Sequence, residues 1–436
     1  MTLIHPAEDL GVLRFITAGS VDDGKSTLIG RLLYDSKAVL SDQLSALARA
    51  KHKRTAGEDI DLALLTDGLE AEREQGITID VAYRYFATAK RKFIIADTPG
   101  HEQYTRNMVT GASTAHAAII LIDATRVSEV DGRTELLAQT KRHSAIVKLL
   151  ALPHVIVAIN KMDLVDYSEA RFDAIRAAYL ALAQRLGLQS VRFVPVSALK
   201  GDNIVTASER MPWYQDEPLL DVLESLPVGE VSGSAAELRF PVQLVARQDG
   251  SHADDFRGYM GRVEAGAISV GQALRVLPAG HRATVAEIIG PRGELAHAHA
   301  GQCVTVRLAE DVDISRGDIL VAAEATVEPA RKLSADLCWF DHEPLSSQRK
   351  YILKQTTANV FARVGSVDSV LDVGTLSHGQ HKGTLEMNDI GAVQISLQKA
   401  LVCDTYEQHP ATGAFVLIDE ATHHTVAAGM IRAFTA

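Results

Sequence analysis

The sequence is poor in cysteine, and it holds no long apolar run that is free of charge. Its three cysteines, Cys303, Cys338 and Cys403, lie far apart and form neither a metal-binding pair nor an even disulfide set. Such spacing argues against a disulfide framework and is typical of thiols in a reducing compartment. The most apolar region, 146–159, contains Lys148 and is too short to cross a bilayer.

Positive charge is also in short supply. The 436 residues include 44 lysines and arginines against 55 acidic residues, which gives a net charge of −11. A general nucleic-acid-binding protein usually carries a basic footprint, so a nucleic-acid partner is not expected. Residues 1–10 contain His5, Glu8 and Asp9 and no apolar core, unlike a secretory signal. We therefore expect a cytoplasmic protein with no membrane partner.

The most informative feature of the sequence is a phosphate-binding loop with two glycines, a lysine and a hydroxyl at fixed spacing. The loop consists of Gly19, Ser20, Val21, Asp22, Asp23, Gly24, Lys25 and Ser26, and Thr27 follows it. An apolar run at 13–18 precedes it and a helical pattern at 27–34 follows, which argues against an ordinary glycine turn. We predict that Lys25 contacts the β- and γ-phosphates and that the Ser26 hydroxyl ligates Mg²⁺.

Three further motifs follow in the order found in guanine-nucleotide-binding proteins. They are Asp97-Thr98-Pro99-Gly100, Asn160-Lys161-Met162-Asp163 and Ser197-Ala198-Leu199. Asp97 ends an apolar run, where its carboxylate can reach the magnesium shell, and Gly100 can offer its N–H to the γ-phosphate. Asp163 can accept two hydrogen bonds from guanine that adenine cannot donate, which selects GTP over ATP. Residues 197–199 are expected to complete the purine pocket.

Two residues beside these motifs are candidates for the hydrolytic step, together with Lys25. Thr78 is predicted to close over Mg²⁺ while GTP is bound and to be released after hydrolysis, so that Ser26, Thr78 and Asp97 form the metal shell. The alternative for Thr78 is the start of a strand. His101 follows the Asp-x-x-Gly segment, where Ras-type GTPases have a glutamine that positions the attacking water. The alternative for His101 is an exposed loop histidine.

The pattern of apolar runs divides the chain. Strand-like runs alternate with helical stretches, such as 168–186, over the first 226 residues, which predicts a mostly parallel sheet with helices on both faces. The segment 227–236 is turn-rich and is the best linker candidate. Short runs split by glycine-bearing turns follow, and they predict two β-barrels. These runs are 240–246, 258–264, 273–277, 285–289 and 303–308, and then 337–340, 359–364, 392–397 and 414–419. The predicted domains are 1–228 for the GTP-binding domain and 237–327 and 328–436 for the barrels.

These motifs resemble a known family. The chain is similar to translation-factor-type GTPases, with an α/β P-loop domain and two β-barrels arranged as in elongation factor Tu. Within that superfamily it most resembles the large GTPase subunits of bacterial sulfate adenylyltransferase. The stretches that carry the resemblance are 19–37, 65–83, 96–113, 199–214 and 412–419. Elongation factors usually place a histidine at the position of Asp23.

The resemblance implies that GTP hydrolysis drives the adenylation of sulfate by ATP, giving adenosine 5′-phosphosulfate and pyrophosphate. It also implies that a smaller partner subunit carries out adenylyl transfer. Two departures from the family pattern stand out: the segment 125–137 is longer than usual, and His409-Pro410 replaces an Asn-Arg pair. Two alternatives remain, a translation-type factor that delivers a specialised RNA and a signalling switch that binds only protein effectors.

Overall fold

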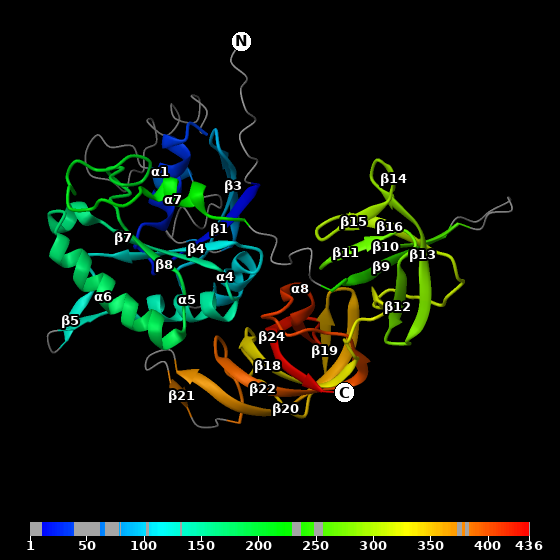
Figure 1. Ribbon diagram of the computed structural model, residues 1–436. Coiled ribbons are helices and arrows are strands. Elements are labelled where there is room, and N and C mark those ends of the chain that lie inside the picture. Colours follow the sequence, from blue (N-terminus) through cyan, green and yellow to red (C-terminus); the bar gives the residue numbers. More distant parts are fainter. Residues whose placement is uncertain are drawn as a thin grey trace, which may run out of the picture. The chain divides into compact units, whose positions relative to one another are not determined.

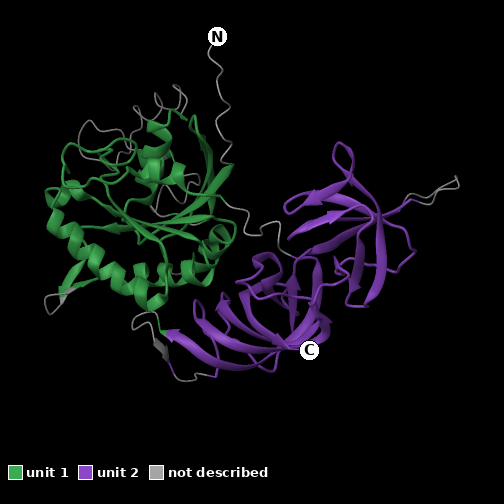
Figure 2. Ribbon diagram, in the orientation of Figure 1, with its two compact units in different colours: residues 1–228, 372–377 green, residues 229–371, 378–436 purple. Residues whose placement is uncertain are grey.

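The computed structural model describes residues 11–38, 62–65, 78, 80–101, 104–130, 133–228, 237–247, 256–372, 377–379 and 383–435. The chain forms two compact units (Figure 2). The first consists of Met1–Val228 with Asp372–Ser377, and the second of Gly229–Leu371 with His378–Ala436. Both barrels belong to the second unit, and the predicted bounds of the three domains stay a prediction.

The first unit is built on a six-stranded sheet in the order β2-β3-β1-β4-β7-β8 (Figure 1). The strands are β1 (Val12–Ala18), β2 (Ala82–Ala87), β3 (Lys92–Asp97), β4 (Ala117–Asp123), β7 (His154–Asn160) and β8 (Val191–Pro195). All neighbours pair in parallel except β2 and β3, which are antiparallel. Every residue of β4 is buried, as expected for a strand covered on both faces.

Helices cover both faces of this sheet. They are α1 (Lys25–Asp35), α4 (Thr105–Ala112), α5 (Ala138–Leu149), α6 (Glu169–Leu186) and α7 (Leu219–Ser225). Leucines of α1 and α7 share one apolar core with the strands, and α4, α5 and α6 lie against the opposite face (Figure 1). The Ser168 side chain caps α6 by accepting the N–H of Arg171, and Gly187 ends the helix with a φ of 68°. The parallel sheet covered on both sides is confirmed.

A small hairpin lies between β4 and α5, within the segment 125–137. Its strands are β5 (Ser128–Val130) and β6 (Arg133–Glu135), which pair antiparallel and form a sheet of their own. Apolar periodicity in the sequence did not predict these strands, because three-residue strands at the surface carry mostly polar side chains.

Two closed barrels of six strands make up the second unit, which confirms the predicted pair. The first closes because β12 pairs with β13 at the two ends of the order β12-β17-β9-β10-β16-β13. Its strands are β9 (Phe240–Arg247), β10 (Arg257–Arg262), β12 (Ala273–Leu277), β13 (His281–Gly290), β16 (Cys303–Leu308) and β17 (Ile319–Ala322). The short strand β14 (Gly293–Leu295) pairs with β13, and β11 (Ala267–Ser269) and β15 (His297–His299) form a separate two-stranded sheet.

The second barrel closes in the same way, through pairing of β19 with β20 in the order β19-β23-β24-β18-β22-β20. Its strands are β18 (Ala330–Trp339), β19 (Tyr351–Gln355), β20 (Ala358–Asp372), β22 (Ile390–Leu401), β23 (Ala414–Asp419) and β24 (Thr425–Thr435). The short strand β21 (Ser377–Gly379) pairs with β20, and the short helix α8 (Pro410–Gly413) precedes β23.

A buried ion pair joins the two barrels within the second unit. Arg239 donates two hydrogen bonds of 2.9 Å to the carboxylate of Asp404, and Thr412 donates a third through its hydroxyl. Burial by itself would raise the pKa of Asp404, but the bonds from Arg239 and Thr412 outweigh it and hold the pKa below its ordinary value. Two-pronged pairing of this kind fixes orientation as well as distance.

Candidate GTP-binding site

The phosphate loop connects β1 to the first turn of α1. Gly24 precedes the helix with a φ of 94°, in the left-handed region that favours glycine. A Cβ at this position would lie 2.4 Å from the side-chain nitrogen of Asn160, so the site also requires glycine for space. The helix therefore begins at Lys25 with its unpaired N–H groups at the loop, an arrangement that binds anions.

Lys25 is buried, and its ammonium group is held inside the loop. Its Nζ donates to the carbonyl oxygens of Gly19 at 2.9 Å and Ser20 at 2.8 Å. Burial lowers its pKa, while the carboxylates of Asp23 and Asp97 oppose that change. Phosphate oxygens offer a negatively charged acceptor in place of these neutral carbonyls, and the ammonium group is attracted to it more strongly. Binding of a nucleotide can therefore replace the hydrogen bonds of Lys25 to the carbonyls of Gly19 and Ser20.

The Asp-x-x-Gly segment packs directly against this loop. A Cβ on Gly100 would lie 2.4 Å from Lys25 Nζ and 2.9 Å from the carbonyl oxygen of Gly19. Thr17 donates to a carboxylate oxygen of Asp97 at 3.3 Å, and Thr98 donates to the carbonyl of Thr17 at 2.7 Å. The end of β3 is thus fixed to the end of β1. Gly100 has no side chain at the position where the γ-phosphate is predicted to lie.

The predicted metal ligands belong to the hard oxygen type that Mg²⁺ prefers. Asp97 is buried at the carboxyl end of β3, and the half-buried Ser26 begins the first turn of α1. One carboxylate and one hydroxyl beside a phosphate site fit Mg²⁺, which usually takes one or two protein ligands together with phosphate oxygens. Thr78, the third predicted ligand, is half-buried and outside regular structure, but 66–77 and residue 79 lie outside the described residues. Its role as a switch stays a prediction.

His101 is exposed at the end of the Asp-x-x-Gly segment. Its ring lies 6.3 Å from that of Tyr104 in an edge-on arrangement, and its carbonyl accepts the Tyr104 N–H at 3.1 Å. Its role in positioning the attacking water stays a prediction.

Asn160 links three of the predicted motifs. Its amide nitrogen donates to the carbonyl of Asp23 in the phosphate loop at 2.8 Å, and its amide oxygen accepts the N–H of Ala198 at 2.9 Å. The next residue, Lys161, has a φ of 62° and pairs with the carboxylate of Asp123 at 2.7 Å. One side chain thus holds the phosphate loop and the purine loops in a fixed relation.

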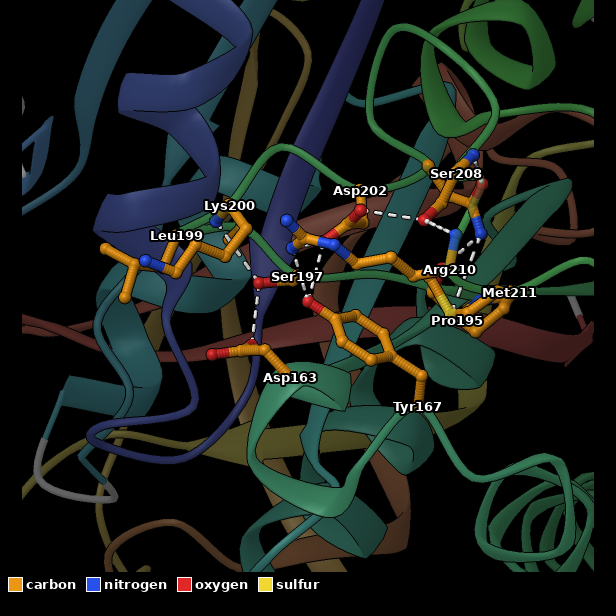
Figure 3. Close-up of polar contacts among 12 residues, drawn as sticks. Asp163, Tyr167, Pro195, Ser197, Leu199, Lys200, Asp202, Ser208, Arg210 and Met211 are labelled. Carbon is orange, nitrogen blue, oxygen red and sulfur yellow. Dashed lines mark hydrogen bonds and ion pairs between the residues drawn. The ribbon is translucent and has the colours of Figure 1, made fainter.

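Asp163 and Ser197 form the predicted base-binding edge. The Ser197 hydroxyl donates to Asp163 at 2.6 Å and accepts the N–H of Lys200 at 3.2 Å (Figure 3). This contact occupies one carboxylate oxygen and orients the Asp163 group. Met162 is fully buried and donates its N–H to the carbonyl of Val196, which anchors the turn that presents Asp163.

A polar network that the sequence did not predict supports this edge (Figure 3). Asp202 accepts hydrogen bonds from the hydroxyls of Tyr167 at 3.2 Å and Ser208 at 2.7 Å. Arg210 donates to the Tyr167 hydroxyl at 2.7 Å. On the other side, Arg31 of α1 donates to the carbonyls of residues 198 and 199. The 199–214 stretch was part of the family resemblance, but no local pattern assigns these contacts.

The structure therefore brings the predicted phosphate loop, the Asp-x-x-Gly segment and the two purine motifs together at the carboxyl edge of one parallel sheet. Asp97 is the last residue of β3 and Asn160 the last residue of β7, with β1 and β4 between these two strands, and the loop after β8 supplies residues 197–199. Ligands of open α/β sheets bind at this edge. The roles of the individual residues in binding GTP stay predictions.

Known proteins resemble this chain over nearly its full length. Residues 11–227 match the family described as Elongation factor Tu GTP binding domain, and residues 332–432 match the GTP-eEF1A C-terminal domain-like family. Sulfate adenylyltransferase subunit 1 of Saccharophagus degradans is 49% identical, over 97% of this chain and 87% of that protein. The protein of the same name from Cellvibrio japonicus is 50% identical, over 98% of this chain and 87% of that protein.

A crystal structure of Sup35 in complex with GDP aligns over 100% of this chain and 97% of that chain, with 22% identity and a TM-score of 0.44. In the part of the chain that the structure describes, no helix is both long and apolar enough to cross a membrane. The full-length identity to the two bacterial relatives confirms the resemblance found in the motifs, and the chain belongs to the sulfate adenylyltransferase subunit 1 family.

Proposed function

We propose that this chain is the GTPase subunit of a heteromeric sulfate adenylyltransferase. It binds GTP with Mg²⁺ and couples GTP hydrolysis to the adenylation of sulfate by ATP on a smaller catalytic partner. The products of that reaction are adenosine 5′-phosphosulfate and pyrophosphate. The observation that carries the proposal is the hydrogen-bonded junction at Asn160, which unites the phosphate and guanine motifs in a chain about half identical to its named relatives.

The residues at this junction have separate tasks in binding the nucleotide. Asp163 accepts two hydrogen bonds from guanine, and an adenine base would leave that carboxylate unsatisfied. Lys25 turns from the carbonyls of Gly19 and Ser20 to the β- and γ-phosphates. Ser26 and Asp97 hold the Mg²⁺, which when bound neutralises charge on the phosphate oxygens.

Gly100, His101 and Thr78 act in the hydrolytic step. Gly100 donates its backbone N–H to the γ-phosphate, and its contact with Lys25 lets it respond when that phosphate leaves. His101 orients the attacking water, and Thr78 closes over the metal while GTP is present. The loss of these contacts after hydrolysis supplies the conformational change that the partner uses.

The test is GTP turnover by this chain with its co-purified small subunit, before and after addition of ATP and sulfate together. We expect a rise that requires both substrates and that is lost in Asp163→Ala and His101→Ala. Asp173→Ala on the exposed face of α6 and His342→Ala in the second unit are matched controls, because both residues are exposed and lie outside the nucleotide motifs.

GTP turnover that does not change when ATP and sulfate are added would count against the coupling role. Stimulation by ribosomes or charged RNA in its place, with steep salt dependence of RNA binding, would move the chain to the translation-factor alternative. GTP binding would stand under either outcome.

A further inference from the structure

The segment that follows β4 contacts the phosphate loop from outside. Arg126 donates a hydrogen bond of 2.6 Å to the carbonyl oxygen of Val21, within the loop. The same guanidinium lies 4.0 Å from Oδ1 of Asp23. That carboxylate oxygen is buried, and among the described residues it accepts no hydrogen bond. Arg126 thus reaches both the backbone of the loop and the acidic side chain beneath it.

The contact to Val21 bears on how the loop presents its donors. In a trans peptide the C=O and the following N–H point in opposite directions. When Arg126 holds the carbonyl of Val21 on its own side, the N–H of Asp22 is turned to the other side, where a phosphate loop gathers its donors. The hydrogen bond from Arg126 therefore restrains the orientation of the peptide between Val21 and Asp22 in the phosphate loop.

The contact to Asp23 offsets the negative charge beneath the phosphate loop. The Asp23 carboxylate is fully buried and accepts the N–H of Ser20 at 2.6 Å. A buried negative charge repels the phosphates that the loop binds. Arg126 is half-exposed and supplies a countercharge without being buried itself.

Arg126 is in turn held by α6. Arg171 of that helix donates to the carbonyls of Ala124 at 2.9 Å and Val127 at 2.8 Å, which flank Arg126 on both sides. It also lies 3.8 Å from Glu129 at the start of the β5–β6 hairpin. At the other end of the hairpin, Glu135 pairs with Lys141 of α5 at 3.3 Å. The base of the hairpin is thus fixed to two helices, and Arg126 projects from it.

We propose that Arg126 is a positioning residue for the phosphate loop, and that Arg171 and the base of the β5–β6 hairpin hold it in place. The hairpin thereby sets the affinity of this chain for guanine nucleotides. This inference rests on GTP binding by the chain and does not depend on the proposed coupling to sulfate adenylation. It gives a role to the segment whose length departs from the family pattern.

The first test measures equilibrium binding of fluorescent GDP and of a non-hydrolysable GTP analogue to the full chain, together with steady-state GTP turnover. Arg126→Ala is expected to raise both dissociation constants by about three- to tenfold, the value of one or two hydrogen bonds. Turnover at saturating GTP should change by less than about twofold, because the contact is present in both ground and transition states. Arg126→Lys, which keeps a charged donor, should recover most of the affinity.

The second test asks whether Arg171 acts through Arg126. Arg171→Ala should weaken nucleotide binding, and the double variant should bind no worse than Arg126→Ala alone. Arg192→Ala, on the edge strand β8, is the matched control for losing an exposed arginine. Thermal unfolding of each variant checks the fold, and Arg171→Lys replaces Arg171→Ala if the latter unfolds. Unchanged affinity in Arg126→Ala, or effects that multiply in the double variant, would overturn the proposal.

Discussion

Replacing Asp23 by asparagine should stabilise the first unit at alkaline pH. The side chain is fully buried under the phosphate loop, and burial raises its pKa from 3.8 to about 6, although Lys25 nearby opposes the change. An acid whose pKa is raised in the folded state stabilises the fold below its unfolded pKa, and that stability is lost as the pH rises through the folded pKa. At pH 8 the wild-type chain has therefore lost all of it, whereas asparagine is neutral throughout.

The size of the effect follows from this shift in the pKa of Asp23. A change from 3.8 to about 6 corresponds to about 3 kcal/mol, at about 1.4 kcal/mol for each pKa unit. The net shift already includes the attraction to Lys25, and asparagine keeps an oxygen that can accept the N–H of Ser20, so about 2 to 3 kcal/mol should remain. For a unit of this size, that raises the unfolding midpoint by roughly 5 to 10 °C at pH 8. By pH 5 the gain should fall to about half.

The assay is thermal unfolding of the nucleotide-free chain at pH 8 and pH 5. The sequence has two tryptophans, and a Trp339→Phe background leaves Trp213, in the first unit, as the fluorescence reporter. Asp22→Asn is the matched control, because Asp22 is the exposed neighbour of Asp23 and asparagine tolerates its φ of 69°. If Asp23→Asn were no more stable than wild type at pH 8, the buried carboxylate would carry no charge penalty and the reasoning would fail.

Three further predictions concern the junctions of the fold. Asn160→Ala removes two buried hydrogen bonds and should weaken the binding of both GTP and GDP by about 10- to 100-fold, as measured by fluorescence titration. A loss of affinity for GTP alone would contradict this prediction. Gly100→Ala places a methyl group 2.4 Å from Lys25 Nζ and should lower the GTP turnover number more than GDP affinity, and equal losses would argue against a role at the γ-phosphate. Arg239→Ala leaves Asp404 buried without its partner and should cost the second unit about 3 to 5 kcal/mol in denaturant unfolding. Because the pKa of Asp404 is depressed, the pair stabilises the fold above the unfolded pKa, so the loss in Arg239→Ala should shrink as the pH falls through the folded pKa.

Strands and helices could be predicted where the spacing of apolar residues follows one period without interruption. The runs predicted at 273–277 and 303–308 coincide with β12 and β16, and the helical pattern at 168–186 is α6 with its cap. Long strands at the surface were underestimated. The run 359–364 lies within β20, which extends to Asp372 because its later residues alternate between buried and exposed faces and include serine and aspartate.

The sequence by itself determined the loop, the order of the nucleotide motifs and the family. These depend on residue types at fixed local spacing, since a strand, a glycine turn and a helix N-terminus together make an anion site. The tertiary structure decided how the motifs meet. Asn160 reaches the phosphate loop across 137 residues, Arg126 reaches it across 105, and Arg239 joins Asp404 across 165. Pairings at such separations depend on the packing of strands and helices against one another, and no local pattern in the chain encodes them.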